Sequence, residues 1–105
     1  MNASKPLGEF ELTVMAAVMH LGDGAYGAAI SEEICARTGR RPAVGAIYTT
    51  LSRMEDKALV SSRVGDPMEG RGGRPRRYFQ ITADGEVVFR ASVQSLKQML
   101  DGIAL

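Results

Sequence analysis

The order of the predicted secondary structure constrains this 105-residue chain more than any other feature of its sequence. Two helices are expected at 28–37 and 43–57, and a proline in the turn 40–42 between them fixes the entry to the second. Two strands are expected at 59–65 and 76–81, separated by a glycine- and proline-rich stretch that cannot form a regular element. This order predicts a winged helix-turn-helix, which is mainly α with a small β-hairpin (α+β).

Two further helices are expected before and after this unit. The first spans 8–21, where apolar residues, beginning with Phe10, recur at helical spacing. The last begins after Thr82, a good N-cap residue, and has acidic residues in its first turn that suit the helix dipole. We expect 1–82 to form the winged unit and 83–105 a C-terminal dimerisation helix, both within one structural unit.

The distribution of charge along the chain is uneven, although the formal net charge is only +1. Residues 37–77 hold ten basic and four acidic side chains, whereas the rest of the chain holds three basic and eight acidic ones. One part therefore carries +6 and the remainder −5. This separation predicts one face that suits a polyanion and another that does not.

The helix expected at 43–57 has one apolar and one polar face. The apolar face is formed by Ile47, Leu51, Met54 and Ala58. The polar face is formed by Gly45, Tyr48, Thr49, Ser52 and Arg53. Small side chains let a helix backbone sit deep in a major groove about 12 Å wide, and hydroxyl and guanidinium groups suit phosphates and base edges. The polar face predicts a recognition helix, and an ordinary solvated face is the alternative.

Four arginines, Arg71, Arg74, Arg76 and Arg77, gather in and beside the tip of the predicted hairpin. Arginines on a glycine-rich tip can follow a phosphate backbone or enter a narrow minor groove. A solvated loop is the alternative, but like charges at this density repel each other unless a polyanion is present. The complete set of predicted DNA-binding residues is Arg41, Ala43, Gly45, Tyr48, Thr49, Ser52, Arg53, Arg71, Arg74, Arg76 and Arg77.

The last helix carries apolar residues spaced four, three, four and three apart, the heptad seam of a helix that packs along a partner. They are Phe89, Val93, Leu96, Leu100 and Ile103. A second copy of the chain could cover this seam, so we predict a homodimer. Packing of the seam on the helix at 8–21 is the alternative, and both arrangements can hold in part.

Residues suited to catalysis or metal binding are few. With one histidine, His20, and one cysteine, Cys35, the chain has too few of these ligands for a metal site and no nucleophile–base pair. We therefore expect no metal, no cofactor and no enzyme. We also expect no membrane span or secretion signal, hence a cytoplasmic protein. Met15, Met19 and Met99 are expected in the core or, as an alternative, in an effector pocket at a dimer interface.

Four segments of the chain resemble the PadR-type transcriptional regulators, in particular short members with a single C-terminal helix. These segments lie at 7–11, 24–30, 44–55 and 72–85. The most specific are I-Y-x-x-L-x-R-M-E in the third predicted helix and G-G-R-P-R-R-Y-F-x-I-T-x-x-G after it.

This resemblance implies a dimer, usually a repressor, that contacts operator DNA through the third helix and the wing. By position, Tyr48 matches the recognition-helix tyrosine of the family, Arg74, Arg76 and Arg77 match its basic wing, and Tyr78 matches its strand aromatic. Some members respond to phenolic or hydrophobic small-molecule effectors, but this chain has no tryptophan to stack on a flat ligand. The alternative is a winged-helix protein-interaction module that does not bind DNA, which has no need for an arginine-rich wing.

Overall fold

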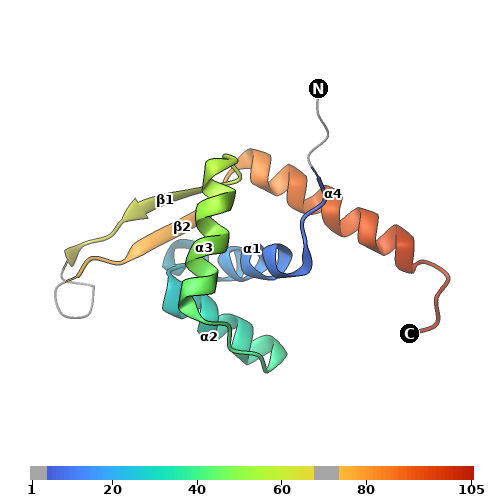
Figure 1. The fold of residues 1–105 in the computed structure, drawn as a ribbon, viewed down its shortest axis with the longest axis horizontal. Helices are drawn as coiled ribbons and strands as arrows, with labels where there is room; N and C mark the ends of the chain where they lie inside the picture. Colours follow the sequence, from blue (N-terminus) through green and yellow to red (C-terminus); the bar gives the residue numbers. More distant parts are fainter. Residues whose placement is uncertain (1–4, 68–73) are drawn as a thin grey trace.

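The computed structural model describes residues 5–67 and 74–105, and shows a three-helix body with a hairpin on one side and a long helix on the other (Figure 1). The elements are α1 (Glu9–Leu21), η1 (Gly22–Gly24), α2 (Gly27–Thr38), α3 (Val44–Asp56), β1 (Val60–Val64), β2 (Arg77–Ile81) and α4 (Ala83–Leu100). The predicted fold class is confirmed, and the predicted bounds of the helices and strands agree with the observed ones to within one residue, except at the C-terminus. The last helix, predicted over 83–105, ends at Leu100.

The hydrophobic core lies between the three helices of the body. Val14 and Met15 of α1, Ile30 of α2, and Ile47 and Leu51 of α3 are completely buried. Removal of these apolar side chains from water is the main force that holds the helices together.

The buried face of α1 agrees with the predicted helical spacing at Val14, Ala17 and Val18 but differs from it at Phe10 and Met15. Phe10 is 37% exposed, whereas Met15 is completely buried. The face that packs on α2 and α3 is therefore turned toward Met15, and Phe10 lies at its margin. Met15 is in the core as predicted, whereas the same prediction is wrong for Met19 and Met99, which are exposed. The alternative, an effector pocket at a dimer interface, stays a prediction.

The hairpin is an antiparallel pair in which Val60 faces Ile81 and Val64 faces Arg77. A third segment adds to it, because Tyr26 forms an isolated β-bridge with Tyr78. In the same segment, the carbonyl of Ala25 accepts a 2.8 Å hydrogen bond from the Phe79 amide. The sequence did not predict this short edge, which fixes the hairpin to the loop before α2.

The C-terminal end of α3 is closed by a Schellman motif with alanine in the left-handed conformation. Ala58 has φ 61°. Its amide donates to the Glu55 carbonyl, and the Leu59 amide donates to the Met54 carbonyl, each at 2.9 Å. The prediction that Ala58 continues the apolar face of α3 is therefore wrong, because the helix ends before this residue and its side chain is exposed.

The junction with α4 is tightly packed. Thr82 caps the helix as predicted, because its Oγ1 accepts a 3.0 Å hydrogen bond from the Gly85 amide and donates 2.8 Å to the Ala58 carbonyl. Gly85 is buried, and a Cβ at this position would lie 2.0 Å from the carbonyl oxygen of Leu59. Only glycine allows the backbone of α4 to approach the α3–β1 connection so closely.

Candidate nucleic-acid interface

The outer face of α3 carries the side chains that the sequence predicts for DNA recognition. Gly45, Thr49, Ser52 and Arg53 are all exposed, because the opposite face of the helix is buried in the core. The Thr49 hydroxyl donates 3.0 Å to the Gly45 carbonyl, which leaves its oxygen lone pairs as acceptors. A helix face with small and polar side chains, which no described element covers, has the shape and chemistry of a major-groove reader.

Tyr48 lies at one edge of this face and is held there by its neighbours. Its ring lies 5.9 Å from that of Phe79, measured between centroids. It also packs against Gly27, where a Cβ would come within 2.7 Å of the tyrosine ring. With 36% of its surface exposed, Tyr48 presents one edge to solvent from a fixed position.

The turn between α2 and α3 is fixed by a buried hydroxyl. Ser31 of α2 donates a 2.7 Å hydrogen bond to the carbonyl of Pro42, two residues before α3 begins. Arg41 in the same turn is exposed and forms an ion pair with Glu32. Ala43, the N-cap residue of α3, is also exposed. The hydrogen bond from Ser31 fixes the position of the N-terminus of α3 relative to α2.

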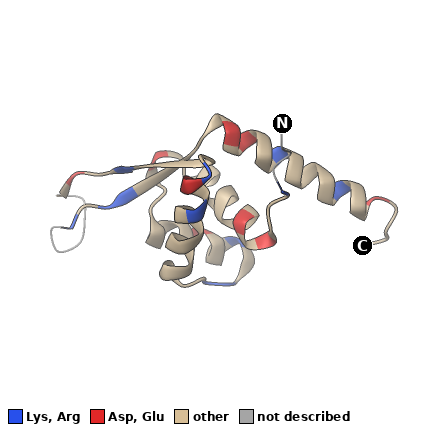
Figure 2. Ribbon diagram, turned by 45° about the horizontal axis from the view of Figure 1, so that its top comes forward, with Lys and Arg blue, Asp and Glu red and all other residues tan. Residues whose placement is uncertain are grey.

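The wing arginines do not share one environment. Arg74 is exposed beside the tip, whereas Arg71 lies outside the described residues. Arg76 packs over the ring of Tyr26, with its Cζ 4.2 Å from the ring centroid, a cation–π distance. Figure 2 shows basic positions along both strands of the hairpin, next to α3.

Arg77 forms contacts within the protein. Its Nη2 lies 3.0 Å from Oε1 of Glu55, near the end of α3, and its Nε donates 3.1 Å to Oγ of Ser62 on β1. Ser62 in turn donates 2.7 Å to Oε2 of Glu55. One carboxylate therefore joins both strands of the wing to α3, a contact that the sequence did not predict.

A further arginine, Arg63, was also missed by sequence reasoning. Its guanidinium lies over Tyr78, 4.5 Å from the ring centroid, and Tyr78 meets Tyr26 edge-on at 5.7 Å. With Arg76, these side chains form a row across the face of the sheet that points away from α3. Two features of the sequence could have indicated this row. Side chains alternate between the two faces along β1, which places Arg63 on one face, and Tyr78 matches the strand aromatic of the family pattern.

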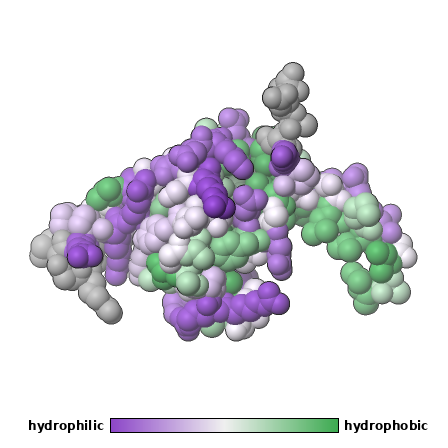
Figure 3. Space-filling model, in the orientation of Figure 1, coloured by the Kyte–Doolittle hydropathy of each residue, from purple (hydrophilic) through white to green (hydrophobic). Residues whose placement is uncertain are grey.

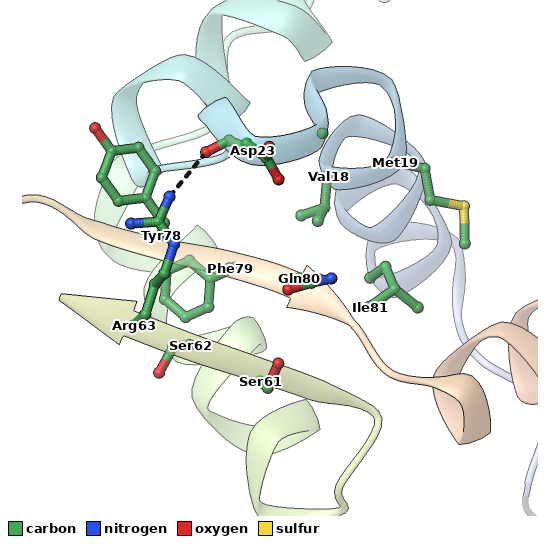
Figure 4. Close-up of a pocket in the computed structure, with 11 residues that line it drawn as sticks. Val18, Met19, Asp23, Ser61, Ser62, Arg63, Tyr78, Phe79, Gln80 and Ile81 are labelled. Carbon is green, nitrogen blue, oxygen red and sulfur yellow. Dashed lines mark hydrogen bonds between the residues drawn. The ribbon is translucent and has the colours of Figure 1, made fainter. Parts of the chain in front are cut away.

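A pocket of about 200 Å³ lies at one end of this row (Figure 4). Val18, Met19 and Ile81 form its apolar end, while Arg63 and Asp23 lie at the other, where Arg63 Nη2 is 3.5 Å from the Asp23 carbonyl. The pocket therefore lies between the end of α1 and the hairpin, on the side remote from α3.

The predicted seam on α4 divides into two parts. Phe89 packs against the core of its own chain and Val93 is half-buried. Leu96 and Leu100 are exposed. Ile103 is also exposed but lies beyond the end of α4, so the prediction that it continues the helical seam is wrong. Figure 3 shows the resulting apolar surface on the C-terminal half of α4. Packing within the chain thus accounts for the first half of the seam, and the second half is not covered by residues 5–67 or 74–105.

Within residues 5–67 and 74–105 no group of three or more histidine, cysteine, aspartate or glutamate side chains is placed to hold a metal ion. No helix in these two ranges has the length and apolar character needed to cross a membrane.

A helix-turn-helix whose second helix is exposed, followed by a hairpin beside it, defines the winged helix-turn-helix class. The family described as "Transcriptional regulator PadR-like family" matches residues 17–91. The chain belongs to this family. PadR-like proteins are regulators of transcription and not enzymes, so the chain is a DNA-binding regulator.

Solved structures show the same fold. A transcriptional regulator from Clostridium thermocellum aligns with a TM-score of 0.73 at 20% identity, covering 89% of this chain and 87% of the other. A PadR family regulator from Eggerthella lenta aligns with a TM-score of 0.68 at 26% identity, covering 90% and 83%. A PadR family regulator from Clostridium difficile aligns with a TM-score of 0.67 at 24% identity, covering 90% and 96%. A search of the curated proteins found no match.

Proposed function

We propose that the chain is a cytoplasmic repressor that binds a nearly palindromic operator as a homodimer. The observation that carries the proposal is the exposed polar face of α3 beside a hairpin with basic side chains on both strands. In this arrangement α3 enters the major groove and the wing follows the adjacent backbone or minor groove. We propose repression because most members of the family are repressors, and a protein bound to the operator blocks access of other proteins to that DNA.

The proposed contacts to DNA come from the turn, α3 and the wing. They are Arg41, Ala43, Gly45, Tyr48, Thr49, Ser52, Arg53, Arg71, Arg74 and Arg76. Arg53 and Arg74 are exposed cations suited to phosphates, whereas Gly45 and Thr49 lie where α3 would meet base edges. In this proposal residues 1–82 act as the DNA-binding unit and 83–105, whose helical part is α4, as the dimerisation segment.

The exposed half of the α4 seam supports the dimer. Leu96 is 51% and Met99 74% exposed, and both line an apolar groove with Leu12 of α1. An apolar surface of this kind on a small protein marks a place where another molecule binds. A second α4 with the same heptad pattern would cover it, and a two-fold dimer would place its two α3 helices in major grooves about 34–36 Å apart. Binding of a phenolic or hydrophobic effector stays a prediction, which rests on the resemblance to the family.

The proposal is tested by fluorescence anisotropy on a labelled duplex that the wild-type protein selects from a random DNA library. Arg53→Gln/Arg74→Gln should weaken binding and flatten the dependence of log Kd on log salt by about 3.6, for four lost phosphate contacts per dimer at about 0.9 each. The matched control, Arg90→Gln/Lys97→Gln, removes the same charge from α4. Equal losses in both variants, or no enrichment of any duplex, would contradict DNA recognition and favour a protein-interaction module.

A further inference from the structure

We infer that Arg77 is a positioning residue, and that Glu55, Ser62 and Arg77 form a clamp that holds the wing at a set angle to α3. The inference rests on the proposed function, because α3 and the wing must meet two different parts of one duplex. It removes Arg77 from the phosphate contacts that the sequence predicts and assigns it a partner inside the protein.

The geometry of the clamp joins three elements through one carboxylate. Both oxygens of Glu55 are used, one by the Ser62 hydroxyl at 2.7 Å and the other by the Arg77 guanidinium at 3.0 Å. Arg77 also bonds Ser62 at 3.1 Å, which closes the triangle between α3, β1 and β2. A guanidinium held at two nitrogens has a fixed plane, and this is the property that distinguishes arginine from lysine.

The clamp lies where the apolar attachment of the hairpin ends. The clamp residue Ser62 pairs across the hairpin with Phe79, which is buried in the core. One step further toward the tip, Val64 pairs with Arg77 and is 68% exposed. The described residues of the outer hairpin therefore have polar contacts to hold them against α3, and the Glu55 carboxylate is the group on α3 that makes them.

Neutralisation of Glu55 tests the inference, because a clamp and a simple surface charge predict opposite changes in DNA affinity. A carboxylate beside a DNA-binding surface repels phosphate, so its neutralisation would strengthen binding if Glu55 had no other part. A clamp predicts the reverse. Glu55→Gln should weaken operator binding about tenfold, comparable with the loss of one good base contact, because the wing no longer meets the duplex in register with α3.

Arg77→Lys provides the second arm. Lysine keeps the positive charge and serves as a point-charge contact to phosphate, but it lacks the planar fork that the clamp uses. We expect Arg77→Lys to weaken binding about as much as Glu55→Gln, with no change in the salt dependence of log Kd, because no phosphate contact is lost. Glu86→Gln is the matched control, since it breaks the exposed Glu86–Arg90 pair within α4.

A measurement without DNA separates this inference from the proposed function. ¹⁵N relaxation should show the order parameters of Val64 and Gly65 falling from about 0.85 toward 0.6 in Glu55→Gln and Arg77→Lys, but not in Glu86→Gln, while α3 stays rigid. Unchanged order parameters, or tighter operator binding by Glu55→Gln, would overturn the clamp. Wild-type affinity in Arg77→Lys would restore Arg77 as a phosphate contact. A wild-type protein that selects no duplex would contradict the proposed function, and the relaxation data would still decide whether the clamp exists.

Discussion

The winged unit and the second half of α4 use their apolar residues in opposite ways. In the winged unit Val14, Ile30 and Leu51 are enclosed by neighbouring elements of the same chain. In α4 the side chains of Leu96 and Leu100 are exposed, although their spacing is as regular as that of any buried face in the protein. The described residues of one chain thus cover the apolar side chains of the winged unit but not those of the second half of α4, a difference that the proposed dimer would explain.

The largest effect is expected from charges placed on the exposed seam of α4. Leu96→Asp/Leu100→Asp should raise the dimer dissociation constant more than about 1,000-fold, since burial of each leucine contributes roughly 1.5–3 kcal/mol and four leucines are lost per dimer. The winged unit should keep its melting behaviour as a monomer. Sedimentation equilibrium measures the dissociation constant, and Gln94→Glu/Gln98→Glu on the polar side of α4 is the control. A variant that remains dimeric, or that unfolds, would break the comparison between the two regions.

The next effect concerns the joint between the regions. Gly85→Ala should lower the free energy of unfolding by about 3 kcal/mol, because the new Cβ would overlap the Leu59 carbonyl and the backbone would have to shift. Urea denaturation followed by circular dichroism measures this loss. Gly45→Ala, at a position where a Cβ meets nothing within 4 Å, should leave stability unchanged or slightly raised. Equal stability of both variants would mean that α4 is not packed as tightly as described.

A smaller loss is expected at the cap of α4. Thr82→Ala removes the hydrogen bond from the Gly85 amide and the one to the Ala58 carbonyl, which should cost about 1–2 kcal/mol of unfolding free energy. Thr82→Ser keeps both bonds and should retain most of the stability. Thermal denaturation of the two variants side by side measures the difference. A serine variant as unstable as the alanine one would assign the effect to the lost methyl group.

The smallest effect is a gain within the winged unit. Ala58→Gly should raise the unfolding free energy by about 0.5–1 kcal/mol, because glycine adopts the left-handed conformation at the end of α3 without strain. Urea denaturation measures the gain, provided that the slope of the unfolding free energy against urea concentration is the same in both proteins. A loss of stability would show that the entropy of glycine in the unfolded chain outweighs the relief of strain. Dimerisation should not change, because Ala58 lies outside α4.

The elements predicted correctly from the sequence depend on local patterns. The ends of the helices follow from periodicity and from residues such as Thr82, whose capping role is set by its immediate neighbours. The exposed face of α3 follows from the same periodicity, because one face carries Ile47 and Leu51 and the other Gly45 and Thr49.

The features that were missed depend on contacts between distant segments. Arg77 and Glu55 are 22 residues apart, and a row of arginines in sequence does not show that one of them has an acidic partner on another element. Tyr26 joins the sheet through a single bridge, too short for alternation to reveal. Ala58 fits the apolar periodicity of α3, but its left-handed conformation is imposed by the path into β1, and alanine carries no sequence signal for it.

The contact between Gly85 and Leu59 has a consequence for the DNA that such a dimer would accept. Because the group that a Cβ at Gly85 would meet is a backbone carbonyl, no change of side-chain rotamer can relieve the close packing of α4 at this joint. In a dimer joined through α4, the separation of the two reading helices is then nearly constant. One added base pair between half-sites turns the second half-site by about 35° around the duplex, which a rigid joint cannot follow. The spacer length of the operator would thus be encoded by a glycine that never touches DNA.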